Sequence, residues 1–392
     1  MQPLEGVRVL DATKLLPGGY CTLMLADLGA EVIRVDDPAE VDHSRWGSDL
    51  ARQDRAYYQT LHRNKKSIVL DLKNPQGREA LLRAAATADI FLESYRPDVK
   101  ERLGIGYSDL KAVNPRIIYC SISGYGQEGP YRNRVGHDIN YQALGGVLAT
   151  TGAAGGPPVV PGVQVADLGA AAMFAAVSIL AALQGRERTG RGQYIDLAML
   201  DGVVSWLQVA AAEYLGLGRT QRRGKMWLSG KWACYTVYCT RGGGYLSLGA
   251  LEPKFWARFC RALGLDSLIE DQYVDEKQEE IRSRVQAILL ERTRDEWMDF
   301  LAGQEICCEP VLEVEEALEH PQIKLRGLVH EVETAGGEVI KLLGTPFSAM
   351  AGKTASPPEI GQHTQEVLAA LGYGEEEMHR MADAGVIYQR EG

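Results

Sequence analysis

Two apolar runs and the stretch between them decide the fold: Val7-Arg8-Val9-Leu10-Asp11 and Glu31-Val32-Ile33-Arg34-Val35-Asp36. Each run predicts a short β-strand, and apolar residues recur at helical spacing over residues 20–29. A strand, a helix and a second strand in this order predict a parallel pair joined by a right-handed crossover. The first turn lacks Gly-x-Gly-x-x-Gly, so a nicotinamide or flavin dinucleotide site is not supported.

The same alternation continues along the first half of the chain. Strands are expected at residues 67–72, 89–94 and 116–123, with a helix over residues 74–86. This order predicts an α/β fold with a Rossmann-like, doubly wound parallel sheet. Ligands of such sheets bind at the carboxyl ends of the strands.

A chain of 392 residues is too long for one simple core, so two domains are expected. We expect a large domain over 1–197, a helical linker over 198–227 that continues a long helix spanning 197–217, and a smaller α+β domain over 228–330. That smaller domain begins with a β-hairpin around Arg241-Gly242-Gly243. Residues 331–392 are expected to return and complete the large domain.

Composition limits the kind of protein. The net charge of −10 argues against a general nucleic-acid binder, which would carry a basic face. The seven cysteines are scattered without a Cys-x-x-Cys pair, which favours reduced thiols. The N-terminus lacks a signal pattern, and the apolar stretch 168–184 is short for a membrane span. We therefore expect a cytoplasmic protein without a membrane partner.

Basic residues gather near the expected strand ends. They are Arg34, Arg63, Lys65, Lys66, Lys73, Arg96 and Arg102. On an acidic chain such a set suits a phosphate-bearing ligand. Solvated loop charges explain the same residues equally well, so both interpretations stay open here.

Two titratable residues, His137 and Asp167, lie 30 residues apart along the chain. Histidine exchanges protons near neutral pH, and burial brings a carboxylate into that range. An aspartate before an apolar helix also serves as a simple N-cap. The chain has no Gly-x-Ser-x-Gly elbow, no Walker loop and no histidine pair at metal-ligand spacing. Acid-base or carboxylate chemistry remains, and no metal is expected.

Ordered motifs along nearly the whole chain resemble the class III CoA-transferase (CaiB/BaiF) family, which includes α-methylacyl-CoA racemases. The matching stretches are Pro3-Leu4-Glu5-Gly6-Val7-Arg8-Val9-Leu10-Asp11, Leu25-Ala26-Asp27-Leu28-Gly29-Ala30-Glu31, Arg63-Asn64-Lys65-Lys66-Ser67, Gly124-Tyr125-Gly126-Gln127-Glu128-Gly129-Pro130 and Met199-Leu200-Asp201-Gly202. The resemblance implies an enzyme that acts on acyl-CoA thioesters, with no cofactor beyond the CoA moiety of the substrate.

The resemblance implies two different uses of the titratable residues. In transferases, an aspartate at the position of Asp167 attacks the thioester and forms an aspartyl-CoA intermediate. In racemases, a motif like Gly136-His137-Asp138-Ile139-Asn140-Tyr141 presents a catalytic histidine opposite that aspartate, and a glutamate matching Glu252 supports the histidine. Asp167-Leu168-Gly169-Ala170-Ala171 is closer to the transferases. We favour a racemase, with a CoA-transferase and a non-catalytic CoA-ester-binding protein as alternatives.

The resemblance also implies the CoA contacts and the assembly. The expected contacts are Arg34, Leu70, Asp71, Leu72, Lys73, Ser94, Tyr95, Arg96, Arg102, Gly136, Asp138, Ile139, Asn140 and Tyr141. The family's proteins form interlocked homodimers, so Glu252 is expected to complete a site with His137 and Asp167 of a second chain.

Racemisation beside a thioester requires one acid-base group on each face of the α-carbon. His137 and Asp167 supply one acceptor and one donor. Because Asp167 is expected at a helix N-terminus, the amides of that first turn are expected near the developing oxyanion.

Overall fold

The computed structural model describes residues 2–40, 49–334, 336–350, 352 and 354–388. The chain divides into two compact units. Unit 1 comprises Met1–Gly145, Gly162–Trp206 and Pro321–Gly392, and unit 2 comprises Gly146–Pro161 and Leu207–His320. The C-terminal segment thus belongs to the same unit as the N-terminus.

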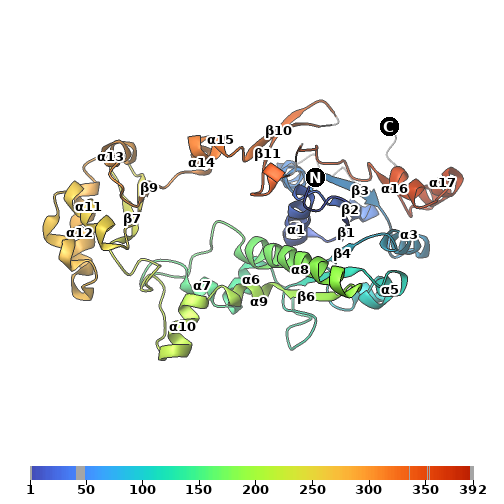
Figure 1. Ribbon diagram of the computed structural model, residues 1–392, viewed down its shortest axis with the longest axis horizontal. Helices are drawn as coiled ribbons and strands as arrows, with labels where there is room; N and C mark the ends of the chain where they lie inside the picture. Colours follow the sequence, from blue (N-terminus) through green and yellow to red (C-terminus); the bar gives the residue numbers. More distant parts are fainter. Residues whose placement is uncertain (1, 41–48, 335, 351, 353, 389–392) are drawn as a thin grey trace. The chain divides into compact units, whose positions relative to one another are not determined.

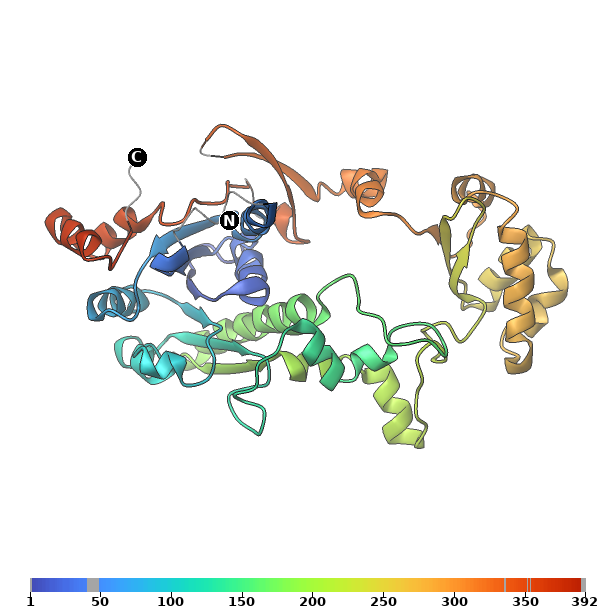
Figure 2. The same cartoon turned by 180° about the vertical axis from the view of Figure 1, so that it is seen from behind.

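Unit 1 is built on a six-stranded sheet with the order β3-β2-β1-β4-β5-β6 (Figures 1 and 2). Its strands are β1 (Arg8–Ala12), β2 (Glu31–Asp36), β3 (Lys65–Val69), β4 (Ile90–Glu93), β5 (Ile118–Ser123) and β6 (Tyr194–Ala198). All neighbouring strands are parallel. The predicted α/β fold with a doubly wound sheet is confirmed, and the strand order reverses between β1 and β4.

Helices cover both faces of this sheet (Figure 1). In chain order they are α1 (Leu15–Asp27), the short turn η1 (Pro38–Glu40), α2 (Asp49–His62), α3 (Pro75–Ala85), α4 (Val99–Arg102), α5 (Tyr107–Val113), α6 (Asp138–Leu144), the π-helix η3 (Val165–Met173), α8 (Phe174–Thr189) and α9 (Met199–Ser205). α1 and α8 lie on one face, and α3 and α5 lie on the other. Because both faces are covered, the central strands are continuous apolar runs, and β4 and β5 are buried throughout.

Two local expectations are wrong, and one strand was not predicted. The helix expected over 197–217 is two helices, α9 and α10 (Gln208–Leu217), and residues 194–198 form the edge strand β6. β3 begins at Lys65, two residues before the expected start, so Lys65 lies inside the sheet with a buried side chain. β6 is a five-residue edge strand, and four of its residues are partly or fully exposed, so its apolar pattern in the sequence is weak.

The C-terminal segment is joined to the N-terminal part of unit 1 by a buried polar network. Asp27 at the end of α1 forms an ion pair with Arg63, and both side chains are fully buried. The same carboxylate accepts hydrogen bonds from Thr345 Oγ1 (2.7 Å) and Ser348 Oγ (3.1 Å). A buried carboxylate needs such partners, so residues more than 300 positions apart are held together.

The remaining elements of this segment are short. They are α15 (Pro321–Leu325), the antiparallel pair β10 (Val329–Glu333) and β11 (Val339–Leu343), η6 (Ser348–Met350), α16 (Thr364–Ala370) and α17 (Glu375–Asp383). Buried residues of α16 and α17, such as Leu368 and Met381, extend the sheet's core.

Unit 2 contains the antiparallel sheet β7-β8-β9. Its elements are α7 (Val147–Thr150), α10, β7 (Tyr235–Cys239), β8 (Tyr245–Gly249), α11 (Pro253–Ala262), η4 (Asp266–Asp271), η5 (Asp275–Lys277), α12 (Gln278–Leu289), α13 (Arg294–Leu301), β9 (Cys308–Pro310) and α14 (Val314–Glu319). β7 and β8 form the predicted hairpin. Trp256, Phe259 and Trp297 are central to its separate core.

One continuous helical stretch, Val165–Thr189, is long and apolar enough to cross a membrane by length and composition. Half of its most apolar window is buried inside the protein. Burial against α1, α9 and the sheet accounts for this apolar character.

Candidate active site

A cavity of about 530 Å³ lies where the strand order reverses. Its walls come from the carboxyl ends of β1, β4 and β5, which contribute Lys14, Ser94–Pro97 and residues 122–125. This is the position at which doubly wound sheets bind ligands. Leu15 at its edge has a left-handed backbone (φ 66°) and a largely exposed side chain, a strained conformation typical of functional loops.

His137 enters this cavity from the start of α6. It is the N-cap residue of that helix, and its own amide donates to Asn140 Oδ1 (3.0 Å). Gly136 precedes it and packs closely against two tyrosines. A Cβ at this position would lie 2.9 Å from the Tyr125 hydroxyl and 2.9 Å from the Tyr141 ring. The tight backbone before α6 therefore fixes where the histidine emerges, while the imidazole itself stays exposed.

Asp167 enters the same cavity from η3, so the structure brings the two predicted titratable groups together. η3 begins at Val165 with Gln164 as its N-cap, and Asp167 is its third residue. The interpretation of Asp167 as a simple N-cap is therefore wrong. π-helical turns are rare and are frequently found at functional sites.

The Asp167 carboxyl holds a proton far more readily than an ordinary aspartate. Its pKa is raised from 3.8 to about 6. Burial is the main cause, the negative charge of Asp138 raises the pKa in addition, and His137 opposes both effects. A carboxyl with a pKa near 6 exchanges protons close to neutral pH, as acid-base catalysis requires.

The first-turn amides of η3 are already occupied. Those of Ala166 and Asp167 donate to Asp138 Oδ1, and that of Leu168 donates to the carbonyl of Gln164. The expectation that these amides face a developing oxyanion is therefore wrong.

The basic residues divide into two groups. Arg34, Arg63 and Lys65 are buried and form ion pairs with Asp36, Asp27 and Asp11. Arg34 also contacts His62 Nε2 (2.8 Å), and it does not line the cavity.

The cavity's own cations are Lys14, Arg96, Arg132 and Arg134. Of these, Arg132 pairs with Asp98 (2.7 Å), and Arg134 stacks on the Tyr131 ring (4.6 Å to the centroid). Among the described lining residues, Asp167 is the single carboxylate. Sequence analysis missed Lys14, which follows β1, and also Arg132 and Arg134, although the Arg- and Tyr-rich loop before Gly136 signals these two arginines.

Only some of the other expected CoA contacts line the cavity. Ser94, Tyr95, Arg96, Gly136, Asn140 and Tyr141 line the cavity. Leu70 is buried and forms a β-bridge with Ile387. The Asp71 carboxylate accepts a hydrogen bond from the backbone amide of Lys73, and the Lys73 side chain is exposed. Arg102 is exposed at the end of α4. Asp138 and Ile139 are not among the residues that line the cavity.

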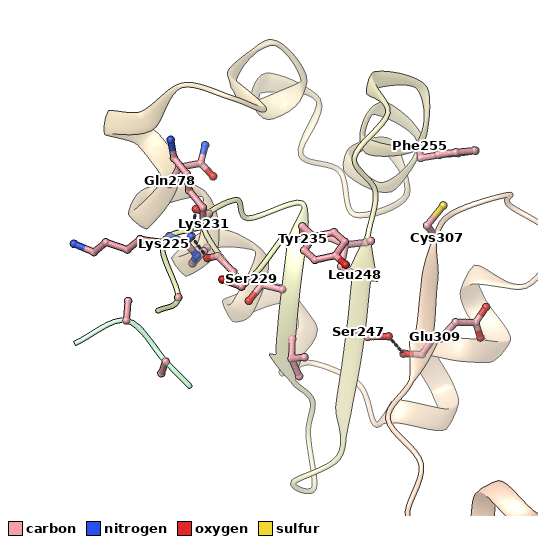
Figure 3. A pocket seen from close by; sticks show the side chains of 18 of the residues that line it. Lys225, Ser229, Lys231, Tyr235, Ser247, Leu248, Phe255, Gln278, Cys307 and Glu309 are labelled. Carbon is pink, nitrogen blue, oxygen red and sulfur yellow. Dashed lines mark hydrogen bonds between the residues drawn. The ribbon is translucent and has the colours of Figure 1, made fainter. Parts of the chain in front are cut away.

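Glu252 belongs to unit 2, where it is the exposed N-cap residue of α11. Unit 2 has its own cavity of about 1700 Å³ (Figure 3). Figure 3 shows Tyr235, Ser247 and Leu248 on its strands, with Ser247 Oγ donating to the carbonyl of Glu309 (3.1 Å). Glu252 lies one turn before Phe255, which lines this cavity. Within one chain the structure thus assigns Glu252 and His137 to separate units.

No group of three or more His, Cys, Asp or Glu side chains in the described part of the chain is suited to a metal ion.

The fold and this site define the class of protein. The model of CoA-transferase family III matches residues 4–364, and the chain belongs to that family. Mouse succinyl-CoA:glutarate CoA-transferase is 36% identical, over 100% of this chain and 92% of its own length. Human α-methylacyl-CoA racemase is 35% identical, over 98% of this chain and 97% of its own length.

A solved structure of a CaiB/BaiF family protein has the same fold. The crystal structure of a CaiB/BaiF family protein from Brucella suis superposes with a TM-score of 0.80 and 30% identity. The match covers 94% of this chain and 99% of that protein. The chain is thus an enzyme of the class III CoA-transferase family, whose similar relatives include both transferases and racemases.

Proposed function

We propose that the enzyme is a 2-methylacyl-CoA racemase that moves a proton between His137 and Asp167 through an enolate. The observation that carries this proposal is that an imidazole and a carboxyl with a pKa near 6 line one cavity. The motif Gly136–Tyr141, which resembles that of racemases, supports the same assignment.

The chemistry follows from the two groups. One of them removes the α-proton, which the thioester carbonyl acidifies, while the other returns a proton to the opposite face. The pair must therefore hold one proton in the active enzyme, on either group. The basic residues Arg96 and Arg134 at the cavity suit the phosphates of CoA.

A CoA-transferase is the second candidate. The Asp167 carboxylate has no hydrogen-bond partner within the described residues, which leaves it available to attack a thioester carbon. In that reaction the aspartyl-CoA intermediate passes CoA to a second carboxylic acid, and His137 moves no proton.

Incubation of a single enantiomer of 2-methylacyl-CoA with the enzyme in D₂O separates the two candidates. We expect deuterium at the α-carbon by mass spectrometry, together with formation of the other enantiomer. Transfer of CoA to an added dicarboxylic acid without α-deuteration would favour the transferase instead. A mixture containing neither product, with substrate bound, would point to the non-catalytic alternative.

We further propose that two chains work as a homodimer in the cytoplasm. α10 supports this, because none of its residues is buried and Val209, Tyr214, Leu215 and Leu217 are exposed. Glu252 would then support His137 of the partner chain. Light scattering at micromolar concentration should give twice the mass of one chain. A monomer with full activity would contradict the homodimer, and recovery in the membrane fraction would contradict the cytoplasmic location.

A further inference from the structure

One carboxylate contacts the backbone around both titratable residues. Asp138 follows His137 directly in α6. Its Oδ1 accepts hydrogen bonds from the amides of Ala166 (2.7 Å) and Asp167 (3.0 Å) at the start of η3. Its Oδ2 accepts from the side-chain amide of Gln142. The side chain of Asp138 thus ties the turn that presents His137 to the turn that presents Asp167.

These hydrogen bonds replace an ordinary N-cap. The first amides of a helix lack partners within the helix, and a side chain usually satisfies them from the residue just before it. Gln164, the N-cap residue of η3, provides no side-chain hydrogen bond. Asp138 provides the cap from 28 residues earlier in the sequence. The position of Asp167 therefore depends on α6, the same helix that places His137.

The charge of Asp138 also acts on the Asp167 carboxyl. Apart from burial, the charges that shift the Asp167 pKa are Asp138, which raises it, and His137, which lowers it. Tyr141 of α6 faces the same carboxyl, and its own pKa is raised to about 12 by burial first and by Tyr125, Asp167 and Asp138 in addition.

None of the charges on the other described helices that pack against η3 is among the causes of the raised Asp167 pKa. Their ionisable side chains are Tyr20, Cys21 and Asp27 on α1, Arg186, Glu187 and Arg188 on α8, and Asp201 on α9.

We propose that Asp138 is the positioning residue of this site, because its carboxylate holds the Asp167 backbone beside His137 and its negative charge acts on the Asp167 side chain. It does not line the cavity, so it acts through Asp167 rather than on substrate. The inference relies on the proposed function only for the reaction that is measured. A transferase would need Asp167 in the same place to attack a thioester.

Asp138→Asn separates the two effects of Asp138, its hydrogen bonds to the η3 amides and its negative charge. The asparagine oxygen still accepts from both amides, while the negative charge is lost. Gln142 is fully buried and its Oε1 has no hydrogen-bond partner among the described residues, so its amide is able to turn and accept from the new Asn nitrogen. The variant is therefore expected to fold and keep the cap.

The measurement is the pH dependence of α-deuteration by the full-length enzyme. The wild-type rate should fall on the acid side near pH 6, where Asp167 titrates. In Asp138→Asn this acid limb should move down by roughly one pH unit, with a plateau kcat within about tenfold of the wild type. Asp138→Ala, which loses the cap as well, should lose about 10²-fold in kcat, as small misplacements of reacting groups do.

Asp383→Asn on α17 removes one exposed aspartate charge and should leave the profile unchanged. An Asp138→Asn profile with the acid limb at the wild-type position would overturn the inference, even if Asp138→Ala proves insoluble. Should the wild type transfer CoA without α-deuteration, the racemase proposal fails. The same pH series, run on CoA transfer, then tests Asp138 by itself, since the nucleophile must be ionised.

Discussion

Asp167→Asn is expected to lower the rate of racemisation by about 10²–10⁴-fold, the usual contribution of a general acid-base group. Exchange of the α-proton with solvent deuterium should be lost for one enantiomer only. With His137 intact, the enantiomer whose α-proton faces the imidazole should still exchange with D₂O, whereas the other enantiomer should not. Chiral separation followed by mass spectrometry measures both quantities. Equal residual exchange of both enantiomers would contradict a two-base site.

The same substitution should stabilise the protein at neutral pH. The folded-state pKa of Asp167 lies near 6, above its ordinary value of 3.8, so the folded chain binds more protons between these pH values. Stability is therefore lost as pH rises through this window, and the full cost is present at pH 7. Because the group is only partly buried, we expect a gain of about 1–2 kcal/mol for the asparagine after discounting for solvent.

Thermal unfolding at pH 7.5 and at pH 4 tests this stabilisation. The difference between Asp167→Asn and the wild type should be a few degrees at the higher pH and should shrink at the lower one. Asp383→Asn, an exposed aspartate on α17, serves as the control for loss of a negative charge. A variant less stable than the wild type at pH 7.5 would show that the ionised carboxylate does not strain the fold.

The sheet was predictable from the sequence because its strands are buried on both faces. β1, β2 and β5 are buried along nearly their whole length, and each contains branched apolar residues that indicate a strand. The alternation of strands and helices is enough to predict that the carboxyl ends of the strands meet at one edge of the sheet. The cavity follows from the same topology. His137 and Asp167 stand out in the sequence because a histidine and a buried carboxylate exchange protons near neutral pH, and because the family resemblance gives both residues a role.

The electrostatic pairing was not predictable from residue types alone. Arg63 looks like a free cation beside a strand, yet its partner Asp27 comes from the end of α1, 36 residues earlier. Arg34 is neutralised by Asp36 in its own strand. A positive residue near a strand end therefore indicates a phosphate site only when no carboxylate is buried beside it, and burial depends on tertiary packing.

The π-helical hydrogen-bond pattern at Asp167 was also not predictable, because it depends on a contact between distant residues. Apolar periodicity over 168–184 predicts a helix but does not distinguish its hydrogen-bond pattern. The start of η3 is set by a carboxylate on a different helix, and that long-range cap leaves no signature in the local sequence. Sequence placed Asp167 in the site, and only the structure relates it to Asp138.

His137→Gln provides the complementary prediction, and it is the one that distinguishes the candidate reactions. The residue is an N-cap whose side chain makes no capping hydrogen bond, and its amide bond to Asn140 remains after substitution. α6 should therefore keep its structure. For a racemase we expect a loss of about 10²–10⁴-fold in racemisation, with residual deuterium exchange confined to the enantiomer that Asp167→Asn cannot exchange.

A CoA-transferase would respond differently, because its nucleophile is Asp167 and His137 moves no proton. His137→Gln should then keep much of the transfer rate, whereas Asp167→Asn should lose it. The matched control is His379→Gln, an exposed histidine on α17 whose Nδ1 contacts the carbonyl of Glu375 in the same helix (2.8 Å). Opposite enantiomer preferences in the two active-site variants require one acid-base group on each face of the α-carbon, and a carboxylate acting alone as nucleophile cannot produce them.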